Sequence, residues 1–377
     1  MRTVGQILDE NKGMGKGFGF LRIALAVTII AWHSFVVSQG DRASFEYRYF
    51  WISNYALLPM FFGLSGFLIA GSAQRLSIGH FFLSRALRIF PALAVETVIS
   101  AVLIGPMVTA LALSDYFQDP GFFRYFQNMW GAVVYTLPGV TFLPPYPEIV
   151  NGVIWTVPIE LACYVAMGAL IFSRLNSRPI ALILIGIALL ALPNAIEWFG
   201  LVRFSEVLRQ SNHLWFFDNI RGDKLLPCFL FGVAAYGLRH RIAYSKIVSL
   251  LSLTALVLLG SLGDAVSVLS HLPATILMCA AAIYLTIYIG CTDLERYAPK
   301  GDYSYGLYIY CFPIQQILNK LLNIHNTAGF LLNFSGSLAI ATGFAIFSWH
   351  LIEKPCLGLR KRFKSGRPAP QTVPSQA

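Results

Sequence analysis

Two ionisable residues, Arg22 and His33, lie within one apolar stretch, GFLRIALAVTIIAWHSF, and are the first candidates for chemistry. A charged side chain inside a membrane helix costs on the order of 3 kcal/mol, so its presence indicates a function. Eleven residues of α-helix rise ~16 Å and leave the two side chains about 20° from alignment. The spacing therefore predicts a ligand channel with a cation at one end and an acid–base group at the other. An arginine that reaches the lipid headgroups and a packing histidine explain this stretch equally well when it is taken alone.

A second pair of cations, Arg85 and Arg88, lies in FFLSRALRIFPAL. A spacing of three puts both side chains on one face of a helix. Two guanidinium groups can bind a phosphate through paired hydrogen bonds. The alternative for this pair is the ordinary excess of positive charge on the cytoplasmic side of a membrane.

One carboxylate, Glu160, falls inside the apolar segment NGVIWTVPIELACYV, with Tyr164 one helical turn further on. An unpaired carboxylate within a membrane either takes up a proton or finds a partner. Glu160 is therefore either the anchor of an ion pair or part of a site, and we favour the site or its immediate surroundings.

The composition shows which elements must position these groups. The chain has 377 residues, of which 56% are hydrophobic and 12% charged, against roughly 25% charged in soluble domains. A mean hydropathy of +0.63 argues against a soluble enzyme, a disordered or fibrous chain and a nucleic-acid-binding protein. Windows long enough to span a bilayer recur about ten times, near 18–38, 50–72, 89–113, 150–173, 179–199, 225–238, 247–264, 271–291, 303–322 and 331–352. We predict an all-α, polytopic helical bundle with about ten transmembrane helices.

Basic residues predict the orientation of this bundle. With ten spans, nineteen of the 28 Lys and Arg residues fall on the side of the two termini, so both termini are expected in the cytoplasm. Residues 1–17 would form a cytoplasmic segment without the features of a cleaved signal. The candidate residues named above then lie in one membrane domain, 18–352, followed by a basic and then disordered tail, 353–377. The loop near 114–149 is aromatic and Pro-rich, as in a folded cap or an interfacial aromatic belt.

The six Cys and seven His residues give no further site. No CxxC spacing and no His cluster is present, so neither a disulfide framework nor a metal site is expected. Nothing in the sequence predicts binding of nucleic acid.

In their order along the chain, these segments resemble the acyltransferase-3 family of bacterial integral-membrane acyltransferases, over about residues 17–362. Arg22 and His33 reproduce the family's Arg-x10-His pattern. Further similar segments are FFGLSGFLI (61–69), RALRIFP (85–91), WTVPIELACY (155–164), SYGLYIYCFPI (304–314) and WHLIEKP (349–355). Three features depart from the family pattern: Cys311 stands where many relatives have His, Thr156 replaces a more usual Ser, and the C-terminal hydrolase-like domain of some relatives is absent.

The resemblance implies a reaction and its participants. The donor would be cytoplasmic acyl-CoA, either acetyl-CoA or succinyl-CoA, and no metal is implied. The acceptor would be a hydroxyl of a surface or secreted glycan, or of a lipid-linked glycan, of the exopolysaccharide or lipopolysaccharide type. The protein would be a multi-pass protein of the bacterial inner membrane, acting with or without polysaccharide-assembly proteins.

The resemblance also suggests roles for the candidate residues. Arg85 and Arg88 would bind the CoA phosphates, with Arg22 at the channel mouth. His33 would act as general base on the acceptor hydroxyl, a role suited to a pKa of ~6.5, or alternatively carry the acyl group. Glu160 would orient His33.

Three aromatic residues, Trp155, Tyr164 and Tyr308, are candidates for stacking on the sugar and hydrogen bonding to it. Their alternative is ordinary core or interfacial packing. At the level of the whole chain, the rival functions are a transporter or flippase for a lipid-linked glycan, and a non-catalytic scaffold in polysaccharide assembly.

Overall fold

The described part of the chain is helical. A computed structural model describes residues 1–39, 55–73, 76–198, 223–262, 271–323 and 326–360. Over these residues the secondary structure consists of helices and two isolated β-bridges, Thr3 with Ala243 and Thr109 with Val140. The predicted all-α class is confirmed. The predicted tail lies outside the described residues from position 361 onward.

Each of the ten predicted windows falls on a helix over its described residues. Five stretches are long and apolar enough to cross a membrane: Phe18–Gln39, Ile78–Val108, Ile154–Phe172, Leu272–Cys291 and Thr327–Leu359. Four further apolar stretches of the described residues are shorter: α5 (Leu57–Ala73), Pro179–Leu192 of α11 (Pro179–Trp198), α14 (Leu225–Gly237) and α15 (Lys246–Ser261). The tenth window is α18 (Ser304–Leu322), whose amide side chains make it more polar. The described part of the chain is thus a bundle of apolar helices, five of them long enough to cross a membrane.

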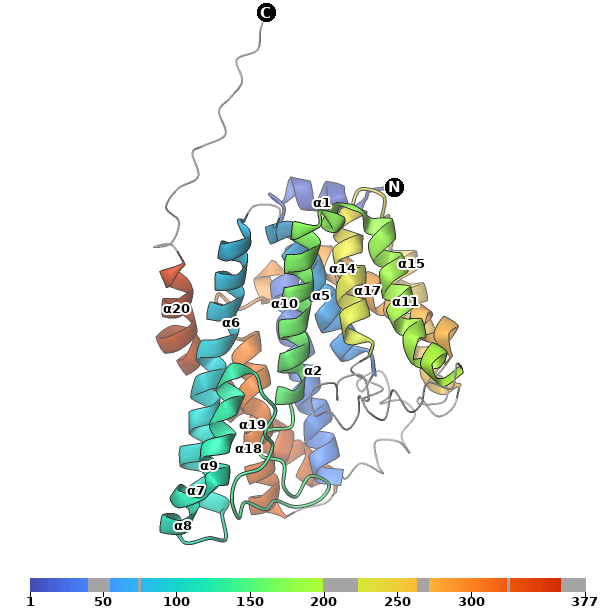
Figure 1. The fold of residues 1–377 in the computed structure, drawn as a ribbon. Helices are drawn as coiled ribbons and strands as arrows, with labels where there is room; N and C mark the ends of the chain where they lie inside the picture. The colour runs from blue at the N-terminus through green and yellow to red at the C-terminus, as the bar shows by residue number, and fades with distance from the viewer. Residues whose placement is uncertain (40–54, 74–75, 199–222, 263–270, 324–325, 361–377) are drawn as a thin grey trace, which may run out of the picture.

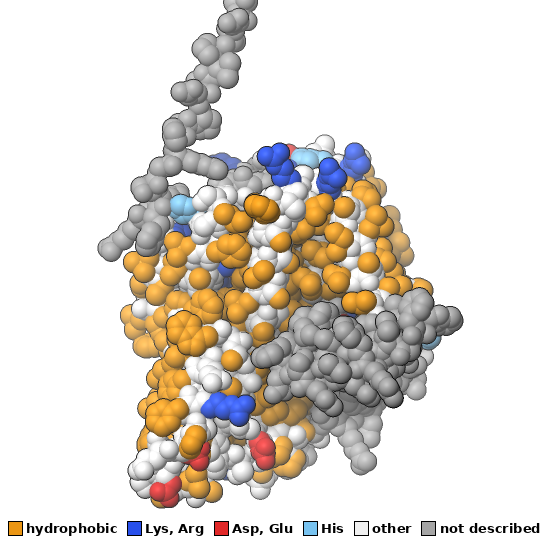
Figure 2. All heavy atoms as spheres, viewed as in Figure 1, with side chains coloured by type: hydrophobic (Ala, Val, Ile, Leu, Met, Phe, Trp, Pro, Cys, Tyr) orange, Lys and Arg blue, Asp and Glu red, His pale blue; other side chains and the backbone are white. Residues whose placement is uncertain are grey.

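The ends of the bundle differ in what covers them. The short helix α1 (Val4–Glu10) lies across one end, and α8 (Leu113–Gln118) and α9 (Pro120–Tyr125) lie at the other (Figure 1). Figure 2 shows hydrophobic side chains over the flank between these ends, with Lys, Arg and His side chains gathered at the α1 end. An apolar flank with polar ends is the surface that a membrane protein presents to lipid.

Helix α6 (Ile78–Ile99) begins eleven residues before the predicted window. Ser77 starts it, because its side chain accepts a hydrogen bond from the backbone N–H of His80, an ordinary N-cap. The helix continues through the π-helical turn η2 (Ser100–Ile104) and α7 (Gly105–Val108). Arg85 and Arg88 therefore lie within the helix and not in a segment that precedes it.

The segment after α7 is folded. Helices α8 and α9 and the loop to residue 150 bury a small core of their own, which includes Tyr116, Tyr125, Leu137 and Phe142. The hydroxyl of Tyr116 donates to the carbonyl of Ala101 in η2 at 2.7 Å. This small core joins the loop to the end of α6.

Helices α5 and α14 pack with their backbones in close contact. A Cβ added to Gly66 would lie 2.1 Å from the carbonyl oxygen of Phe229, and one added to Gly232 would lie 2.1 Å from that of Gly63. Small residues allow such close approach between helices in a membrane. The pair forms one wall of the cavity described below.

Candidate active site

A cavity of about 470 Å³ lies among α2 (Phe18–Gln39), α5, α6, α10 (Val157–Phe172) and α18. Its lining on α5 extends from Leu58 to Ser72, which corresponds to ~21 Å of helix. At the Ser72 end it is bounded by Tyr236 of α14 and by the N-terminal residues Gly13 and Met14. At the other end lie Leu58 and Tyr308. The cavity is thus an elongated channel, and the end marked by Ser72 lies near α1.

Three arginines, Arg22, Arg85 and Arg88, line this one cavity. The structure therefore brings Arg22 together with the pair Arg85 and Arg88, which the sequence analysis singled out separately. Arg22 comes from α2, and Arg85 and Arg88 come from neighbouring turns of α6. Three guanidinium groups on one wall can bind an anion such as a phosphate or diphosphate.

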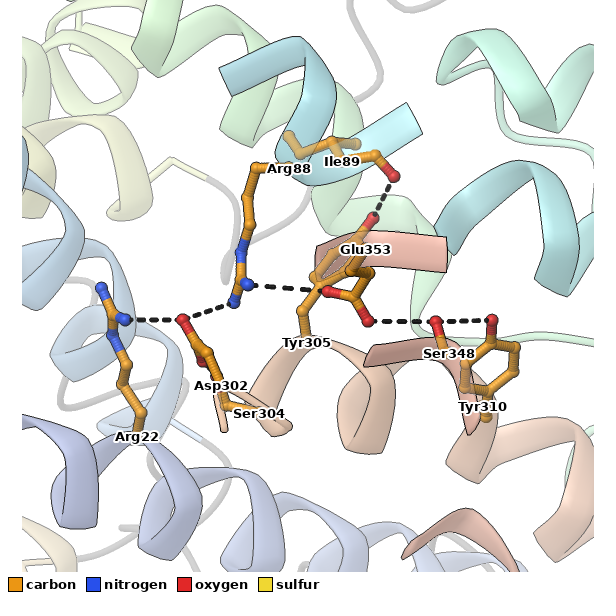
Figure 3. A network of polar contacts seen from close by, with 9 residues as sticks. All are labelled: Arg22, Arg88, Ile89, Asp302, Ser304, Tyr305, Tyr310, Ser348 and Glu353. Carbon is orange, nitrogen blue, oxygen red and sulfur yellow. Dashed lines mark hydrogen bonds and ion pairs between the residues drawn. The ribbon is translucent and has the colours of Figure 1, made fainter. Parts of the chain in front are cut away.

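Two of these arginines are tied to one carboxylate (Figure 3). Oδ2 of Asp302 lies 2.9 Å from Nη1 of Arg22 and 3.0 Å from Nη2 of Arg88. Ser304 donates to Oδ1 of Asp302 at 2.8 Å. Asp302 lies in the loop before α18. Although its burial acts to raise the pKa of Asp302, the charges of Arg88 and Arg22 outweigh that effect and lower it to about 2, so the carboxylate is ionised at neutral pH.

Glu160 and Tyr164 lie on the α10 wall of the cavity. The hydroxyl of Tyr164 donates to Oε1 of Glu160. The guanidinium carbon of Arg85 lies 5.9 Å from the centre of the Tyr164 ring, within cation–π distance. The structure thus places Glu160 and Tyr164 in the half of the cavity that holds the arginines.

The end of the cavity away from α1 is lined by hydroxyl and apolar groups. The Tyr308 hydroxyl lies 2.8 Å from Oγ1 of Thr156 and donates to the carbonyl of Val153 at 3.1 Å. Phe61 lies beside Tyr308, with ring centres 6.5 Å apart. Trp155 is half-buried and packs against the main core, and is not among the described lining residues.

His33 lies beyond this end of the cavity. Its ring meets that of Phe312 edge-on, with centres 5.4 Å apart. Phe312 follows Tyr308 by four residues on α18, which is about one helical turn, or ~6 Å. His33 is not among the described lining residues. His33 is thus separated from the arginines along α2, and Tyr308 and Phe312 lie between the cavity and His33.

Two acidic residues that the sequence analysis did not select, Asp302 and Glu353, take part in the arginine cluster. Oε2 of Glu353 lies 3.5 Å from Nη1 of Arg88. Glu353 stands in the WHLIEKP segment and Asp302 two residues before SYGLYIYCFPI. An acid inside one motif and another just before the next were usable signals, since a carboxylate at a membrane span needs a partner.

A third acid, Glu96, was also missed. It is 1% exposed, and its Oε1 accepts hydrogen bonds from Ser100 at 2.7 Å and from Asn151 at 2.8 Å. Asn151 accepts from the backbone N–H of Val153. Glu96 therefore stabilises the turn that leads into α10 and its Thr156.

The cysteine thiols in the described residues are free. Cys311 is buried, and its thiol donates to the Tyr308 carbonyl at 3.1 Å. Within the described ranges, no three His, Cys, Asp or Glu side chains are grouped so that they could hold a metal ion.

Comparison with known proteins gives a match over nearly the whole chain. The acyltransferase-3 family model, described as an acyltransferase domain, matches residues 16–350. An O-acetyl transferase of Shigella phage Sf6 is 27% identical over 352 residues, covering 89% of this chain and 94% of the relative. Nodulation protein 10 of Rhizobium leguminosarum bv. viciae is 24% identical over 381 residues, covering 95% and 97%. No solved structure matches the chain significantly.

Proposed function

Because this chain belongs to the acyltransferase-3 family and is an acyltransferase, we propose that it moves an acetyl group from cytoplasmic acetyl-CoA to a hydroxyl of a surface or secreted glycan. The observation that supports this most strongly is the channel itself. Three arginines line one part of it, and its far end is one helical turn of α18 from His33. A donor with a phosphate-bearing end and a long neutral arm fits this arrangement.

The arginine half of the cavity fits the CoA phosphates. Arg85 and Arg88 would contact them from α6, and Arg22 from α2. CoA supplies an activated thioester when it is bound. The apolar and hydroxyl groups between the arginines and Tyr308 would hold its neutral arm and exclude water, which protects a thioester from hydrolysis.

An acetyl group suits the far end better than a succinyl group. Among the described residues there, which include Leu58, Phe61, Thr156 and Tyr308, none carries a positive charge that would bind the free carboxylate of a succinyl group. One of the relatives is itself named an O-acetyl transferase. Both observations support acetyl-CoA as the donor.

His33 would act as general base. Its neutral imidazole takes the proton of the acceptor hydroxyl as the hydroxyl oxygen attacks the thioester carbonyl carbon. The carbon–sulfur bond then breaks, and the imidazolium returns the proton to the departing sulfur, so no net proton is consumed. The hydroxyls of Tyr308 and Thr156, which donate to the carbonyl of Val153 in this structure, would exchange that bond to donate to the carbonyl oxygen or to the sugar. Transfer of the acyl group through His33 itself is the alternative route.

We keep Glu160 among the proposed site residues because it accepts a hydrogen bond from Tyr164, whose ring lies beside Arg85. That contact supports a role in the donor half of the cavity. The orientation of His33 by Glu160 remains a prediction, as do sugar contacts of Trp155.

We place the protein in the bacterial inner membrane, with about ten spans and both termini in the cytoplasm. The ten helices on the predicted windows and the basic side chains at the α1 end support this placement. In that orientation the arginines lie in the cytoplasmic half of the channel, where acetyl-CoA is available, and His33 lies toward the outer face.

Transfer in membrane vesicles tests the function. Inverted vesicles that contain the protein would be supplied with radiolabelled acetyl-CoA on their outer, cytoplasmic face. The label should appear as base-labile ester on the polysaccharide of the producing cell, and vesicles with His33→Ala should give none. Movement of a lipid-linked glycan across the membrane without ester formation would instead support the transporter alternative, and acceptors would be compared between lipopolysaccharide and exopolysaccharide fractions.

A further inference from the structure

The three arginines of the cavity differ in the number of carboxylates that they contact. Arg88 contacts two carboxylates, Asp302 at 3.0 Å and Glu353 at 3.5 Å, and its side chain is 17% exposed. Its guanidinium also lies 5.8 Å from the centre of the Tyr305 ring. Arg22 shares the Asp302 carboxylate. Two cations and two anions thus form one compensated cluster (Figure 3).

The two carboxylates lie behind the cavity wall. Arg22 and Arg88 line the cavity, whereas Asp302 and Glu353 are not among its described lining residues. Each carboxylate therefore contacts its arginine without lining the cavity itself, Glu353 from a fully buried position and Asp302 with its side chain 30% exposed. A group in that position orients a ligand-binding side chain without touching the ligand itself.

Glu353 is fixed from behind by a chain of hydroxyl groups. Its side chain is fully buried, its Oε1 accepts from Ser348 at 3.0 Å, and Ser348 accepts from Tyr310 at 3.2 Å. It closes the π-helical turn η7 (Trp349–Glu353), which joins α19 (Thr327–Ser348) to α20 (Lys354–Leu359). Such turns re-aim side chains and are frequent at functional sites.

Arg85 has no comparable support. In the described part of the chain it makes no ion pair, and its buried Nε has no hydrogen-bond partner. Its described contact is with the Tyr164 ring. Its guanidinium therefore binds no carboxylate of the described residues directly, not even the nearby Glu160, and is available to an anionic ligand, whereas Arg88 already binds two carboxylates.

We propose that Asp302 and Glu353 are positioning residues of the donor site, which hold Arg22 and Arg88 in the cavity wall, while Arg85, whose guanidinium no described carboxylate binds directly, binds a donor phosphate. This inference rests on the proposed use of acetyl-CoA. It assigns different roles in donor binding to Arg85 and Arg88 of α6, which the sequence alone does not distinguish.

The test compares Asp302→Asn with Asp293→Asn. Asp293 lies in the same connection between α17 (Leu272–Cys291) and α18, and forms an exposed ion pair with Lys16 at 3.4 Å, so it is a matched control. Binding of acetyl-CoA to the purified, detergent-solubilised full-length protein would be measured by calorimetry, and KM and kcat by acetyl transfer. For Asp302→Asn we expect a Kd and a KM for acetyl-CoA raised roughly 10- to 100-fold, as for loss of a hydrogen bond to a charged group.

The same variant should leave the KM for the acceptor polysaccharide unchanged and kcat within about twofold, since positioning of the donor phosphates acts on ground-state and transition-state binding alike. Asp293→Asn should match the wild type in every constant. A purely structural role for Asp302 would lower the active fraction and kcat without a selective effect on the donor, and that result would overturn the proposal.

A double-mutant cycle tests Glu353, because Glu353→Gln alone could fail to fold. If Glu353 acts through Arg88, then Glu353→Gln should weaken donor binding in the wild type but add nothing in an Arg88→Gln background. Ser348→Ala, which removes one hydrogen bond behind Glu353, is the milder second variant and should show the same dependence on Arg88. Additive losses in both cycles would overturn the assignment.

The outcomes separate this inference from the proposed function. If the wild type binds acetyl-CoA and Asp302→Asn binds it equally well, the positioning role fails and the donor assignment stands. If the wild type binds neither acetyl-CoA nor CoA, both fail together.

Discussion

The arginine end of the channel and the histidine end are held by different kinds of contact. At the arginine end, Arg22, Arg88, Asp302 and Glu353 form a cluster of ion pairs. At the histidine end, side-chain amides bind backbone carbonyls. Gln315 donates to the carbonyl of Ile30 at 2.7 Å and to Ser34 at 2.8 Å, so it holds the turn of α2 that carries His33.

Neighbouring amides extend the histidine end in the same manner. Asn319 donates to the carbonyl of Val37 at 3.0 Å, and Asn333 of α19 donates to that of Gln315 at 2.9 Å. Gln316 donates to the carbonyls of Tyr146 and Ile149, both at 2.8 Å. These contacts join α2, α18, α19 and the loop before α10 without any charge.

The difference matches the chemistry proposed for each end. Charged partners suit a site that must receive an anionic phosphate and stay neutral overall when it is filled. Neutral amides suit a site where an imidazole must act as a base, because they place no charge beside it. The following experiments test this division, from the largest expected effect to the smallest.

Replacement of His33 by Ala should have the largest effect on activity. Loss of a general base lowers kcat about 10²- to 10⁴-fold. Because His33 lies outside the arginine half of the channel, the Kd for acetyl-CoA should not change. Transfer assays and calorimetry on one preparation would measure both, and retained activity would remove His33 from the mechanism.

Arg88→Leu should have the largest effect on stability. Removing one partner of a buried ion cluster leaves Glu353 unpaired, which costs about 3–5 kcal/mol. Thermal unfolding in detergent would measure this, and Arg85→Leu is the control because Arg85 has no ion-pair partner in the described structure. Equal destabilisation by both variants would show that the two arginines are not different.

Gln315→Leu should cost less than Arg88→Leu. The change leaves the carbonyl of Ile30 and the hydroxyl of Ser34 without their donor, at about 1–3 kcal/mol for a buried polar group. The same unfolding assay applies, with Ser335→Ala on the exposed face of α19 as control. A loss of stability as large as that of Arg88→Leu would mean that the amide contacts stabilise the protein as much as the ion pairs do.

Asp302 predicts how the charged end responds to pH. The pKa of Asp302 in the folded protein, about 2, lies below its ordinary value of 3.8. Its ionised form therefore stabilises the protein fully above pH ~4, and this contribution is lost as the pH falls toward 2. The difference in thermal stability between the wild type and Asp302→Asn should be constant from pH 5.5 to 8 and shrink below pH 4; a change between pH 6 and 8 would contradict the assignment.

Cys311→Ser should have the smallest effect. The serine hydroxyl can donate to the Tyr308 carbonyl as the thiol does, and the substituted atom differs little in size. Transfer activity and unfolding temperature should stay close to those of the wild type. A strong loss of activity would show that the position has a role in the reaction, as the histidine of many relatives suggests.

Local patterns predicted most of the fold. Apolar windows gave the ten helices because burial in lipid depends on composition over about 20 residues. The start of α6 was missed, since hydropathy does not register the cap made by Ser77. The π-helical turns η2 and η7 leave no simple local pattern in the sequence.

The sequence predicted several residues of the candidate site but not the contacts between those that are far apart in the chain. The spacing of Arg22 and His33 gave their separation along α2, because helix geometry is local. The contacts of Arg88 with Asp302 and Glu353 join residues more than 200 positions apart. A single sequence does not contain such pairings, which is why Arg85 and Arg88 looked equivalent.

The most direct test of the account measures donor binding and transfer for Arg85→Ala and His33→Ala in parallel. Calorimetry with acetyl-CoA and CoA would use purified protein, and transfer would use membrane vesicles. The account predicts that Arg85→Ala loses donor binding and that His33→Ala binds acetyl-CoA as the wild type does but transfers nothing. Donor binding that survives Arg85→Ala and is lost with His33→Ala would contradict the division of the channel into a donor end and a catalytic end.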